Sequence, residues 1–224
     1  MRTRFPALFW SLLLGLACST YAQSTKVERQ RQLEPAIKTF EELDKKEPPP
    51  KGAVLFIGSS SIALWKSLGQ DFPAVRTINR GFGGSHVEDS IDFADRIVIP
   101  YRPRLIVMYA GDNDIESGKS PFVVLEDFKR FVTVVHRKLP RTRIAFISIK
   151  PSPARWRLVD QVREANRLTK DFMKTNRRLD YIDVFSSMLG KDGKPRPELY
   201  IEDNLHMSQA GYELWRSLVA PRLR

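Results

Sequence analysis

Short apolar runs alternate with amphipathic helical patterns along this chain, and this alternation limits the folds that are open to it. The clearest run, Ala53 to Ile57, has no polar position, as expected for a strand that is buried on both faces of a parallel sheet. Further strand-like runs follow at residues 75–79, 105–110, 144–149 and 181–184. Helical patterns separate or follow these runs at residues 61–69, 86–98, 125–139, 160–176 and 212–219. Because strands that alternate with helices form crossover connections, the chain predicts a parallel sheet between two helical layers.

One domain accounts for most of the chain. The sequence has 224 residues, of which 42% are hydrophobic, and both values are ordinary for one medium-sized globular domain. Residues 26–47 place apolar side chains at helical spacing, and Pro48-Pro49-Pro50 ends this pattern. We therefore predict an α/β protein with a single three-layer α/β/α domain over residues 23–224, which includes an N-terminal helical extension over residues 26–47.

The first residues are typical of a targeting segment. Arg2 and Arg4 give it a positive start, residues 7–17 are mostly apolar, and Thr20-Tyr21-Ala22 offers a small-residue cleavage site. The apolar run is shorter than the roughly 20 residues that a membrane-spanning helix needs. We therefore predict a signal peptide over residues 1–22, export to the periplasm or the exterior, and no transmembrane span.

The single cysteine of the chain, Cys18, lies inside this segment. Cleavage after Ala22 would remove it, and the mature protein would then have neither a disulfide nor a thiolate. The alternative is a lipoprotein whose acylated first residue is Cys18. Gly15-Leu16-Ala17 lacks the large aliphatic residue that a lipobox usually places three positions before the cysteine, so soluble export is favoured.

The chain is basic, with a formal net charge of +11. A basic surface can attract nucleic acid or anionic polymers. However, the basic residues are interspersed with acidic ones, as in Lys45-Lys46-Glu47 and Asp127-Phe128-Lys129-Arg130, and no compact basic run with interleaved aromatic residues occurs. This pattern favours a solvated surface, so we expect no nucleic-acid partner. For an exported protein, anionic polymers of the cell envelope are the more sensible long-range partners.

Four polar strings stand at comparable places in the predicted fold. Gly58-Ser59-Ser60-Ser61 follows the first strand, Gly83-Gly84 follows the second, and Gly111-Asp112-Asn113-Asp114 follows the third. Asp203-Asn204-Leu205-His206 precedes the last helix. Ligands of open parallel sheets bind beyond the carboxyl ends of the strands, so we expect these strings to meet at one edge.

Three of these residues have the chemistry of a serine nucleophile and its base. Ser60 lies at a strand-to-helix turn, where unpaired N–H groups and the helix dipole favour negative charge. The spacing of Asp203 and His206 lets the carboxylate bind one ring nitrogen while the other nitrogen accepts a serine proton. The alternatives are a helix cap at Ser60 and an Asp cap beside a surface histidine. The ordered set of strings favours the nucleophile.

In their fixed order the four strings resemble the SGNH hydrolases, also called the GDSL esterase/lipase family. This resemblance implies a flavodoxin-like, five-stranded parallel sheet and metal-independent ester hydrolysis through an acyl-enzyme, with no cofactor. It makes Ser60, two residues after the glycine, the nucleophile of a triad with Asp203 and His206. Ser59 replaces the aspartate of the family's string and Ser61 replaces its aliphatic residue, and Ser61 is the better candidate for a helix cap.

The resemblance also implies an oxyanion hole made of the backbone N–H groups of Ser60 and Gly84 and the side-chain amide of Asn113. Glycine permits a backbone N–H to approach a substrate oxygen. Gly84 is preferred to Gly83 because it stands directly before a polar residue. Without the resemblance, Gly83-Gly84 would be interpreted as a tight turn, and Gly111-Asp112-Asn113-Asp114 as a turn or a metal site. Few histidines and no remaining cysteine argue against zinc, and the oxygen ligands are too few for calcium, so we expect no metal.

Four further side chains are candidates for the substrate pocket. Ser85 and His86 follow the oxyanion glycine, and Arg155 and Trp156 lie in the proline-rich loop after the fourth strand. The alternative for Trp156 is that it packs inward in a rigid loop. These candidates are mostly polar or stiff, whereas each methylene of a long acyl chain needs apolar surface to gain about 0.8 kcal/mol.

We therefore expect an exported serine esterase that hydrolyses short-chain carboxylic esters of a small molecule or a glycan, such as an O-acetyl ester of a carbohydrate. Two alternatives stay open. One is a non-catalytic carbohydrate- or envelope-binding protein with the same fold. The other is a lysophospholipase or thioesterase of the same family, because family members act on lipids, acetylated sugars, thioesters and aryl esters. The motifs carry no information on the oligomeric state.

Overall fold

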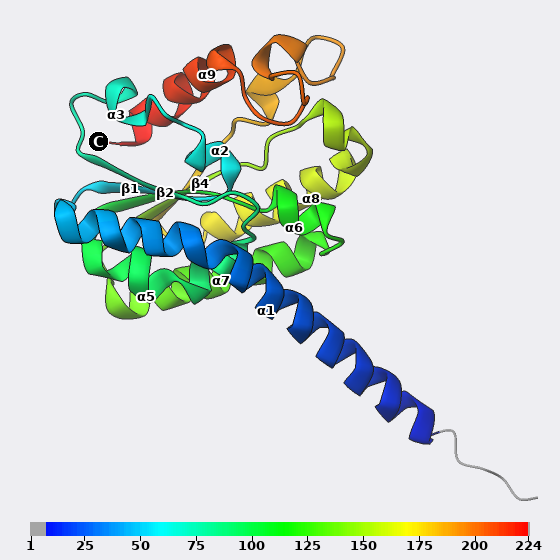
Figure 1. Ribbon diagram of the computed structural model, residues 1–224. Coiled ribbons are helices and arrows are strands. Elements are labelled where there is room, and N and C mark those ends of the chain that lie inside the picture. Colours follow the sequence, from blue (N-terminus) through cyan, green and yellow to red (C-terminus); the bar gives the residue numbers. More distant parts are fainter. Residues whose placement is uncertain (1–7, 224) are drawn as a thin grey trace, which may run out of the picture.

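The structure is a computed structural model that describes the backbone of residues 8–223 and the side chains of residues 26–223. Its centre is one sheet of five parallel strands in the order β2-β1-β3-β4-β5. The strands are β1 (Val54–Gly58), β2 (Thr77–Gly81), β3 (Leu105–Tyr109), β4 (Arg143–Ile147) and β5 (Leu179–Ile182). Helices cover both faces of the sheet (Figure 1), which confirms the predicted three-layer α/β/α fold.

The helices of the two outer layers differ in length. The α-helices are α1 (Leu8–Lys46), α2 (Ser60–Ala63), α3 (Leu68–Asp71), α4 (Val87–Asp92), α5 (Ala94–Ile97), α6 (Asp112–Glu116), α7 (Pro121–Lys138), α8 (Val159–Met173) and α9 (Gln209–Val219). Short 3₁₀ helices are η1 (Ile99–Tyr101), η2 (Pro153–Leu158), η3 (Ser186–Met188), η4 (Pro197–Leu199) and η5 (Ala220–Arg222). Helices α2, α3 and α9 lie over one face of the sheet, and α1, α5 and α7 lie over the other (Figure 1).

Side chains of successive strand residues enter two separate apolar cores. Leu55 and Ile57 of β1 pack with residues of α1, α4, α5, α7 and α8. Val54 and Phe56 of the same strand pack with residues of α2, α3 and α9 on the opposite face. Every residue of β1 is buried, which explains why this run contains no polar side chain.

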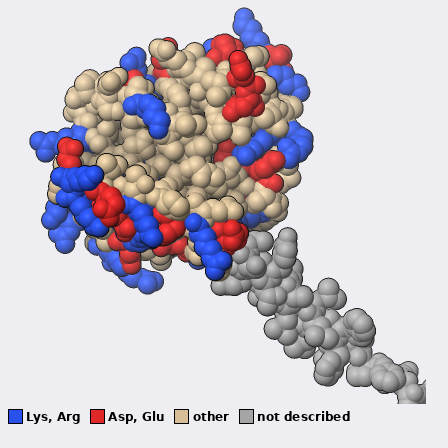
Figure 2. Space-filling view, viewed as in Figure 1, with Lys and Arg blue, Asp and Glu red and all other residues tan. Residues whose placement is uncertain are grey.

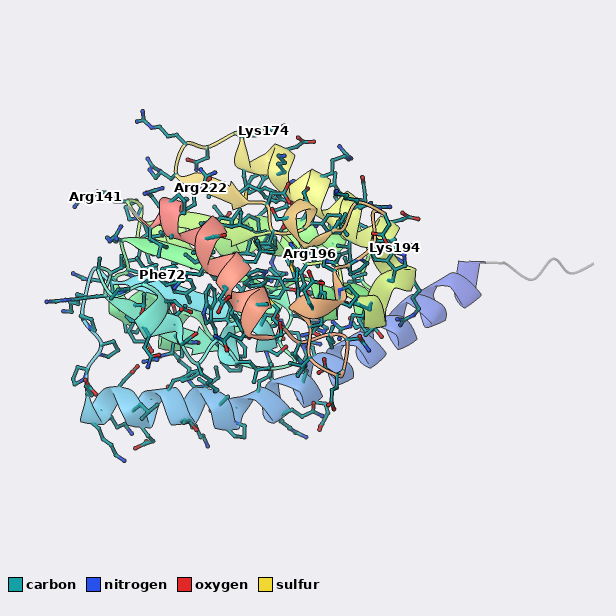
Figure 3. The ribbon with its side chains drawn as sticks, turned by 90° about the horizontal axis from the view of Figure 1, so that it is seen from above. Phe72, Arg141, Lys174, Lys194, Arg196 and Arg222 are labelled. Carbon is teal, nitrogen blue, oxygen red and sulfur yellow. The ribbon has the colours of Figure 1, made fainter. Side chains whose placement is uncertain are left out.

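Seen from above, α9 lies over the sheet, and α1 runs along one edge of the domain (Figure 3). Leu33 of α1 is buried in the apolar core. Arg96 of α5 binds Glu34 and Glu41 of α1 through hydrogen bonds of 2.7–2.9 Å. The predicted helix over residues 26–47 is therefore part of a longer helix, which begins before this range and ends one residue short of it.

Two predicted helices are each divided into two shorter ones. The range 61–69 contains α2 and the start of α3, and the range 86–98 contains α4 and α5. After α2, the carbonyl oxygen of Ile62 accepts hydrogen bonds from the amide of Asn79 at 2.8 Å and from the backbone N–H of Trp65 at 3.1 Å. These contacts end the regular helical pattern of hydrogen bonds at α2.

The ends of two strands also differ from the prediction. β2 begins two residues later than the predicted run and β5 begins two residues earlier. Pairing with the neighbouring strand explains both shifts, because Thr77 lies opposite Val54 and Leu179 lies opposite Ile144. The apolar composition of a segment does not indicate which residues of the neighbouring strand it pairs with, so these strand ends could not be predicted from it.

In the part of the chain that the structure describes, no helix has both the length and the apolar character needed to cross a membrane. The predicted signal peptide over residues 1–22, with Cys18, lies outside the residues whose side chains are described. On the face shown in Figure 2, basic and acidic side chains are interspersed.

Gly58 ends β1 and lies against β3. Its φ is +125°, and a Cβ atom at this residue would lie 1.8 Å from the carbonyl oxygen of Tyr109. We expect Gly58→Ala to lower the free energy of unfolding by more than about 2 kcal/mol in urea denaturation, because the backbone and Tyr109 both exclude a methyl group. Gly69→Ala is the control, because no atom lies within 4 Å of that Cβ position. A change of similar size in both variants would contradict this account.

Candidate active site

The four polar strings lie together at the carboxyl edge of the sheet. Ser60 is the first residue of α2, directly after β1. Gly83 lies in the loop after β2, and a Cβ atom on it would be 3.9 Å from Cβ of Ser60. Asn113 lies in α6, after β3, and His206 lies shortly before α9. The topology of the sheet thus brings residues from distant parts of the chain to one place.

Ser60, His206 and Asp203 form a continuous hydrogen-bonded chain. The distance from Ser60 Oγ to His206 Nε2 is 3.0 Å, and the distance from His206 Nδ1 to Asp203 Oδ2 is 2.6 Å. The carboxylate can only accept when ionised, so Nδ1 carries the proton and Nε2 accepts from the serine hydroxyl. Ser60 and His206 are both partly exposed.

A tight turn fixes the carboxylate of Asp203. Its Oδ1 accepts the backbone N–H groups of Leu205 at 2.9 Å and His206 at 2.8 Å. Asn204, which directly follows Asp203, has a φ of +57°. Slight burial acts to raise the pKa of Asp203, but hydrogen bonds from the His206 side chain and from these N–H groups lower it to about 2. The carboxylate is therefore ionised at neutral pH.

Asn113 connects the loops that follow β2 and β3. Its Nδ2 donates to the carbonyl oxygen of Ser85 at 3.1 Å, and its Oδ1 accepts from Nη1 of Arg155 at 3.0 Å. Ser60 stands at the first position of α2, where a backbone N–H has no partner within the helix.

Gly84 has a φ of +77°, a conformation that other residues adopt only with strain. Apart from its two chain neighbours, no atom of the described residues lies within 4 Å of the position of a Cβ atom on this residue. The requirement for glycine in the free protein is therefore conformational, whereas the sequence argument relied on space for a substrate.

Ser85 and His86 lie in the interior and not on the wall of an open pocket. Their exposed fractions are 0% and 6%, and among the described residues neither Ser85 Oγ nor His86 Nδ1 has a hydrogen-bond partner. Burial, with the nearby charges of Arg29 and Lys119, lowers the pKa of His86 to about 3. Its imidazole is therefore neutral.

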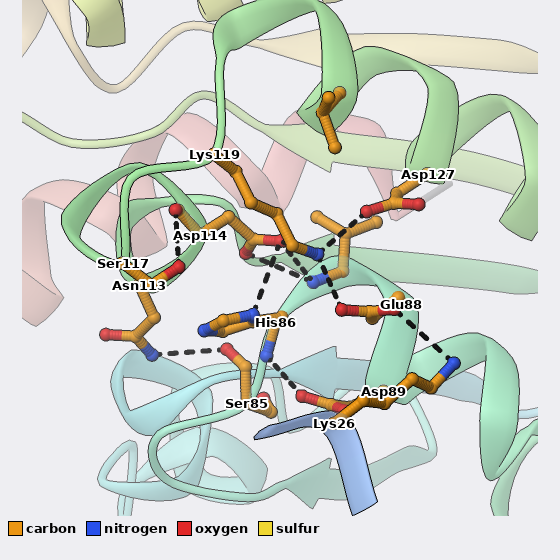
Figure 4. Close-up of polar contacts among 12 residues, drawn as sticks. Lys26, Ser85, His86, Glu88, Asp89, Asn113, Asp114, Ser117, Lys119 and Asp127 are labelled. Atoms are coloured by element: carbon orange, nitrogen blue, oxygen red, sulfur yellow. Dashed lines mark hydrogen bonds and ion pairs between the residues drawn. The ribbon is translucent and has the colours of Figure 1, made fainter. Parts of the chain in front are cut away.

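A network of buried and partly buried ionisable side chains contacts this loop (Figure 4). Asp114 accepts from the backbone N–H of Val87 at 3.2 Å and from Lys119 at 3.2 Å, and Lys119 also binds Glu88 at 2.7 Å. Burial raises the pKa of Asp114 to about 7. For Lys119, burial acts to lower the pKa, but Asp114, Glu88 and Asp127 together raise it to about 12.

Helix α1 joins the same network. Arg29 binds Asp89 at 2.9 Å and Glu88 at 2.6 Å, and Asp89 in turn accepts the backbone N–H of His86 at 2.7 Å. Sequence reasoning did not find these residues. Asp114 stands in one of the quoted strings and could have been noted, but no spacing along the chain relates Arg29 to the loop after β2.

Arg155 and Trp156 come from η2, after β4, and both are partly buried. Both line a cavity of about 10 Å³, which has room for about one water molecule. The Trp156 ring faces Lys194 Nζ at 4.8 Å and the Arg163 guanidinium at 5.7 Å. The Trp156 ring is therefore in contact with cations from α8 and from the loop that contains Lys194.

The described residues contain no group of three or more His, Cys, Asp and Glu side chains placed to hold a metal ion.

A sequence model of the GDSL-like lipase/acylhydrolase family matches residues 57–214. No curated protein matches the chain. The matched range includes Ser60, Gly84, Asn113, Asp203 and His206, and it leaves out α1.

Solved structures share the fold at low sequence identity. A Streptococcus pneumonia protein named after platelet activating factor is 20% identical, has a TM-score of 0.78, and is matched over 92% of this chain and 99% of its own. A GDSL-like lipase from Bacteroides thetaiotaomicron is 18% identical, with a TM-score of 0.71, over 84% of this chain and 96% of its own. A variant of an acetyl-xylooligosaccharide esterase from Geobacillus Stearmophilus is 15% identical, with a TM-score of 0.64, over 78% of this chain and 95% of its own. The match to the family model over most of the described residues shows that this chain belongs to the GDSL-like lipase/acylhydrolase family.

Proposed function

We propose that this protein is an exported serine esterase that hydrolyses short-chain carboxylic esters through an acyl-enzyme on Ser60. The observation that carries the proposal is the hydrogen-bonded chain from Ser60 to His206 and Asp203, with distances of 3.0 and 2.6 Å. Export is proposed from the positive start and apolar run of residues 1–22.

In the proposed reaction, Ser60 Oγ attacks the ester carbonyl carbon while His206 Nε2 takes its proton. Asp203 stabilises the imidazolium through the hydrogen bond to Nδ1. The tetrahedral intermediate collapses, His206 returns the proton to the departing alkoxide, and the alcohol leaves an acyl group on Ser60. A water molecule then repeats the sequence, which releases the carboxylic acid and restores the serine.

The negative oxygen of the intermediate would lie among three donors: the backbone N–H groups of Ser60 and Gly84 and Nδ2 of Asn113. Such donors stabilise the transition state because they are oriented before charge develops, and one donor contributes about 3 kcal/mol. The hydrogen bond from Asn113 to Ser85 supports this role, since it already points the amide toward the loop of Gly84.

The proposed substrate is a short-chain ester of a small molecule or a glycan, such as an O-acetyl group on a carbohydrate. The name of one structural neighbour, an acetyl-xylooligosaccharide esterase, supports acetylated glycans. Exposed large apolar side chains are Val27, Leu43, Leu64, Phe122, Val123 and Ile201. Val27 and Leu43 lie on α1, and Phe122 and Val123 lie on α7. Of the six, Leu64 and Ile201 are the two that are close in sequence to the triad, so a long acyl chain would find few of these apolar partners there.

We expect Ser60→Ala to lower kcat for p-nitrophenyl acetate by at least about 10³-fold, because it removes the nucleophile. Ser59→Ala and Ser61→Ala are matched controls and should keep a substantial fraction of wild-type activity. Their side chains are buried, and within the described residues their hydroxyl oxygens have no hydrogen-bond partner. Wild-type turnover in Ser60→Ala, or loss of turnover in Ser59→Ala alone, would disprove the assignment.

Acyl length can be tested with p-nitrophenyl esters from acetate to palmitate. We expect kcat/KM to be highest for acetate and butyrate, because each added methylene needs apolar surface to gain about 0.8 kcal/mol. Rates of Ser60→Ala, measured in parallel, correct for spontaneous hydrolysis. An optimum at palmitate would point instead to a lysophospholipase or a long-chain thioesterase of the same family.

A further inference from the structure

Arg155 binds Asn113 and is held in place by buried charges. Its side chain is 18% exposed, and Nη1 lies 3.0 Å from Oδ1 of Asn113 and 3.2 Å from Oδ2 of Asp112. Its Nε also lies 3.8 Å from a carboxylate oxygen of Glu116. One guanidinium therefore contacts three residues of α6, the helix that carries Asn113.

The contact decides which way the amide of Asn113 faces. A guanidinium is only a donor, so the amide atom next to Arg155 has to be the oxygen. The NH₂ group then points to the other side, where it donates to the carbonyl oxygen of Ser85 at 3.1 Å. A flipped amide would place its NH₂ group against the Arg155 guanidinium and its oxygen against the carbonyl oxygen of Ser85, so both contacts disfavour the flip. The proposed oxyanion requires this orientation, because it needs a donor.

An ion pair with Asp112 holds Arg155 in place. Asp112 is buried and shares Oδ2 between Arg155 and Lys150, at 3.2 and 3.1 Å. Burial acts to raise the pKa of Asp112, but Lys150 and Arg155 hold it below its usual value. Lys150 is 3% exposed and also lies 3.2 Å from the hydroxyl of Tyr109. Asp112, held by Lys150, thus gives Arg155 a buried and fixed partner that a solvent-facing arginine would lack.

The loop of Arg155 also contacts the turn that carries the base. The backbone N–H of Ala154 donates to the carbonyl oxygen of Asn204 at 3.1 Å, and Asn204 directly follows Asp203. The loop that contains Arg155 therefore contacts both halves of the site, the amide of Asn113 and the turn of Asp203.

We propose that Arg155 is a positioning residue that keeps Nδ2 of Asn113 directed at the oxyanion. This inference rests on the proposed esterase function. It differs from the role expected from the sequence, in which Arg155 contacts the substrate. Arg155 acts through Asn113, so its effect disappears when Asn113 is absent.

A double-mutant cycle with p-nitrophenyl acetate tests the proposal. We expect Asn113→Ala to lower kcat by about 10²-fold, and Arg155→Met by about 10-fold with KM little changed. The double variant should match Asn113→Ala within about 3-fold, because a residue that acts through another is not additive with it. Additive losses, or a raised KM with unchanged kcat in Arg155→Met, would overturn the proposal.

Two controls separate positioning from damage to the fold. Arg157→Met changes a more exposed arginine of the same 3₁₀ helix, which binds Glu116 at 2.7 Å, and should keep wild-type kcat. Arg155→Lys retains the charge but lacks the planar guanidinium, whose Nη1 lies between Asn113 and Asp112 while its Nε faces Glu116, so it should lose part of kcat. If Arg155→Met does not fold, Arg155→Lys serves in the same cycle.

A second measurement does not depend on activity. In ¹⁵N-labelled protein, the side-chain NH₂ signals of Asn113 are identified by their loss in Asn113→Ala. We expect these signals to shift and to exchange faster with water in Arg155→Met, and to stay unchanged in Arg157→Met. Unchanged signals in Arg155→Met would overturn the inference even if the protein had no esterase activity. An inactive wild type with shifted signals would refute the proposed function alone.

Discussion

Coverage of both faces of the parallel sheet is the constraint on which the rest of the structure depends. Because helices pack on both sides, every residue of β1 and β3 is buried and these strands have no room for polar chemistry. Polar side chains gather where the strands end. Gly58 turns the chain out of β1 beside Tyr109, and Ser60 follows at the start of α2. The site is thus a consequence of the layering, and its parts come from loops far apart in sequence.

Paired charges in the interior hold those loops. The carboxyl groups of Asp89 and Asp114 accept backbone N–H groups at the start of α4, and Arg29 binds the first while Lys119 binds the second. Breaking such a pair leaves a buried charge without compensation, which is far more costly than losing a surface pair. This network makes α1, which lies outside the range matched by the family model, part of the support of the loop that follows β2.

The sequence predicted the layers and the chain of residues from Ser60 to His206, because both depend on local signals. An apolar run such as Ala53–Ile57 is typical of a buried strand, and the spacing of Asp203 and His206 fits one turn. Helix breaks and strand ends were missed because tertiary contacts set them, such as the amide of Asn79 on Ile62. The contact between Arg155 and Asn113 joins segments that are distant in sequence, and so do the contacts around His86. No pattern along the chain could therefore predict them.

The central claim is that Ser60 is a nucleophile activated by His206, and covalent labelling tests it most directly. A fluorophosphonate reacts with serines that have an adjacent general base, and the labelled peptide is found by mass spectrometry. The account predicts one label per chain, on Ser60, with labelling slowed by at least about 10²-fold in His206→Gln, since the base is lost. Labelling of Ser59 or Ser61, or an unchanged rate in His206→Gln, would contradict it.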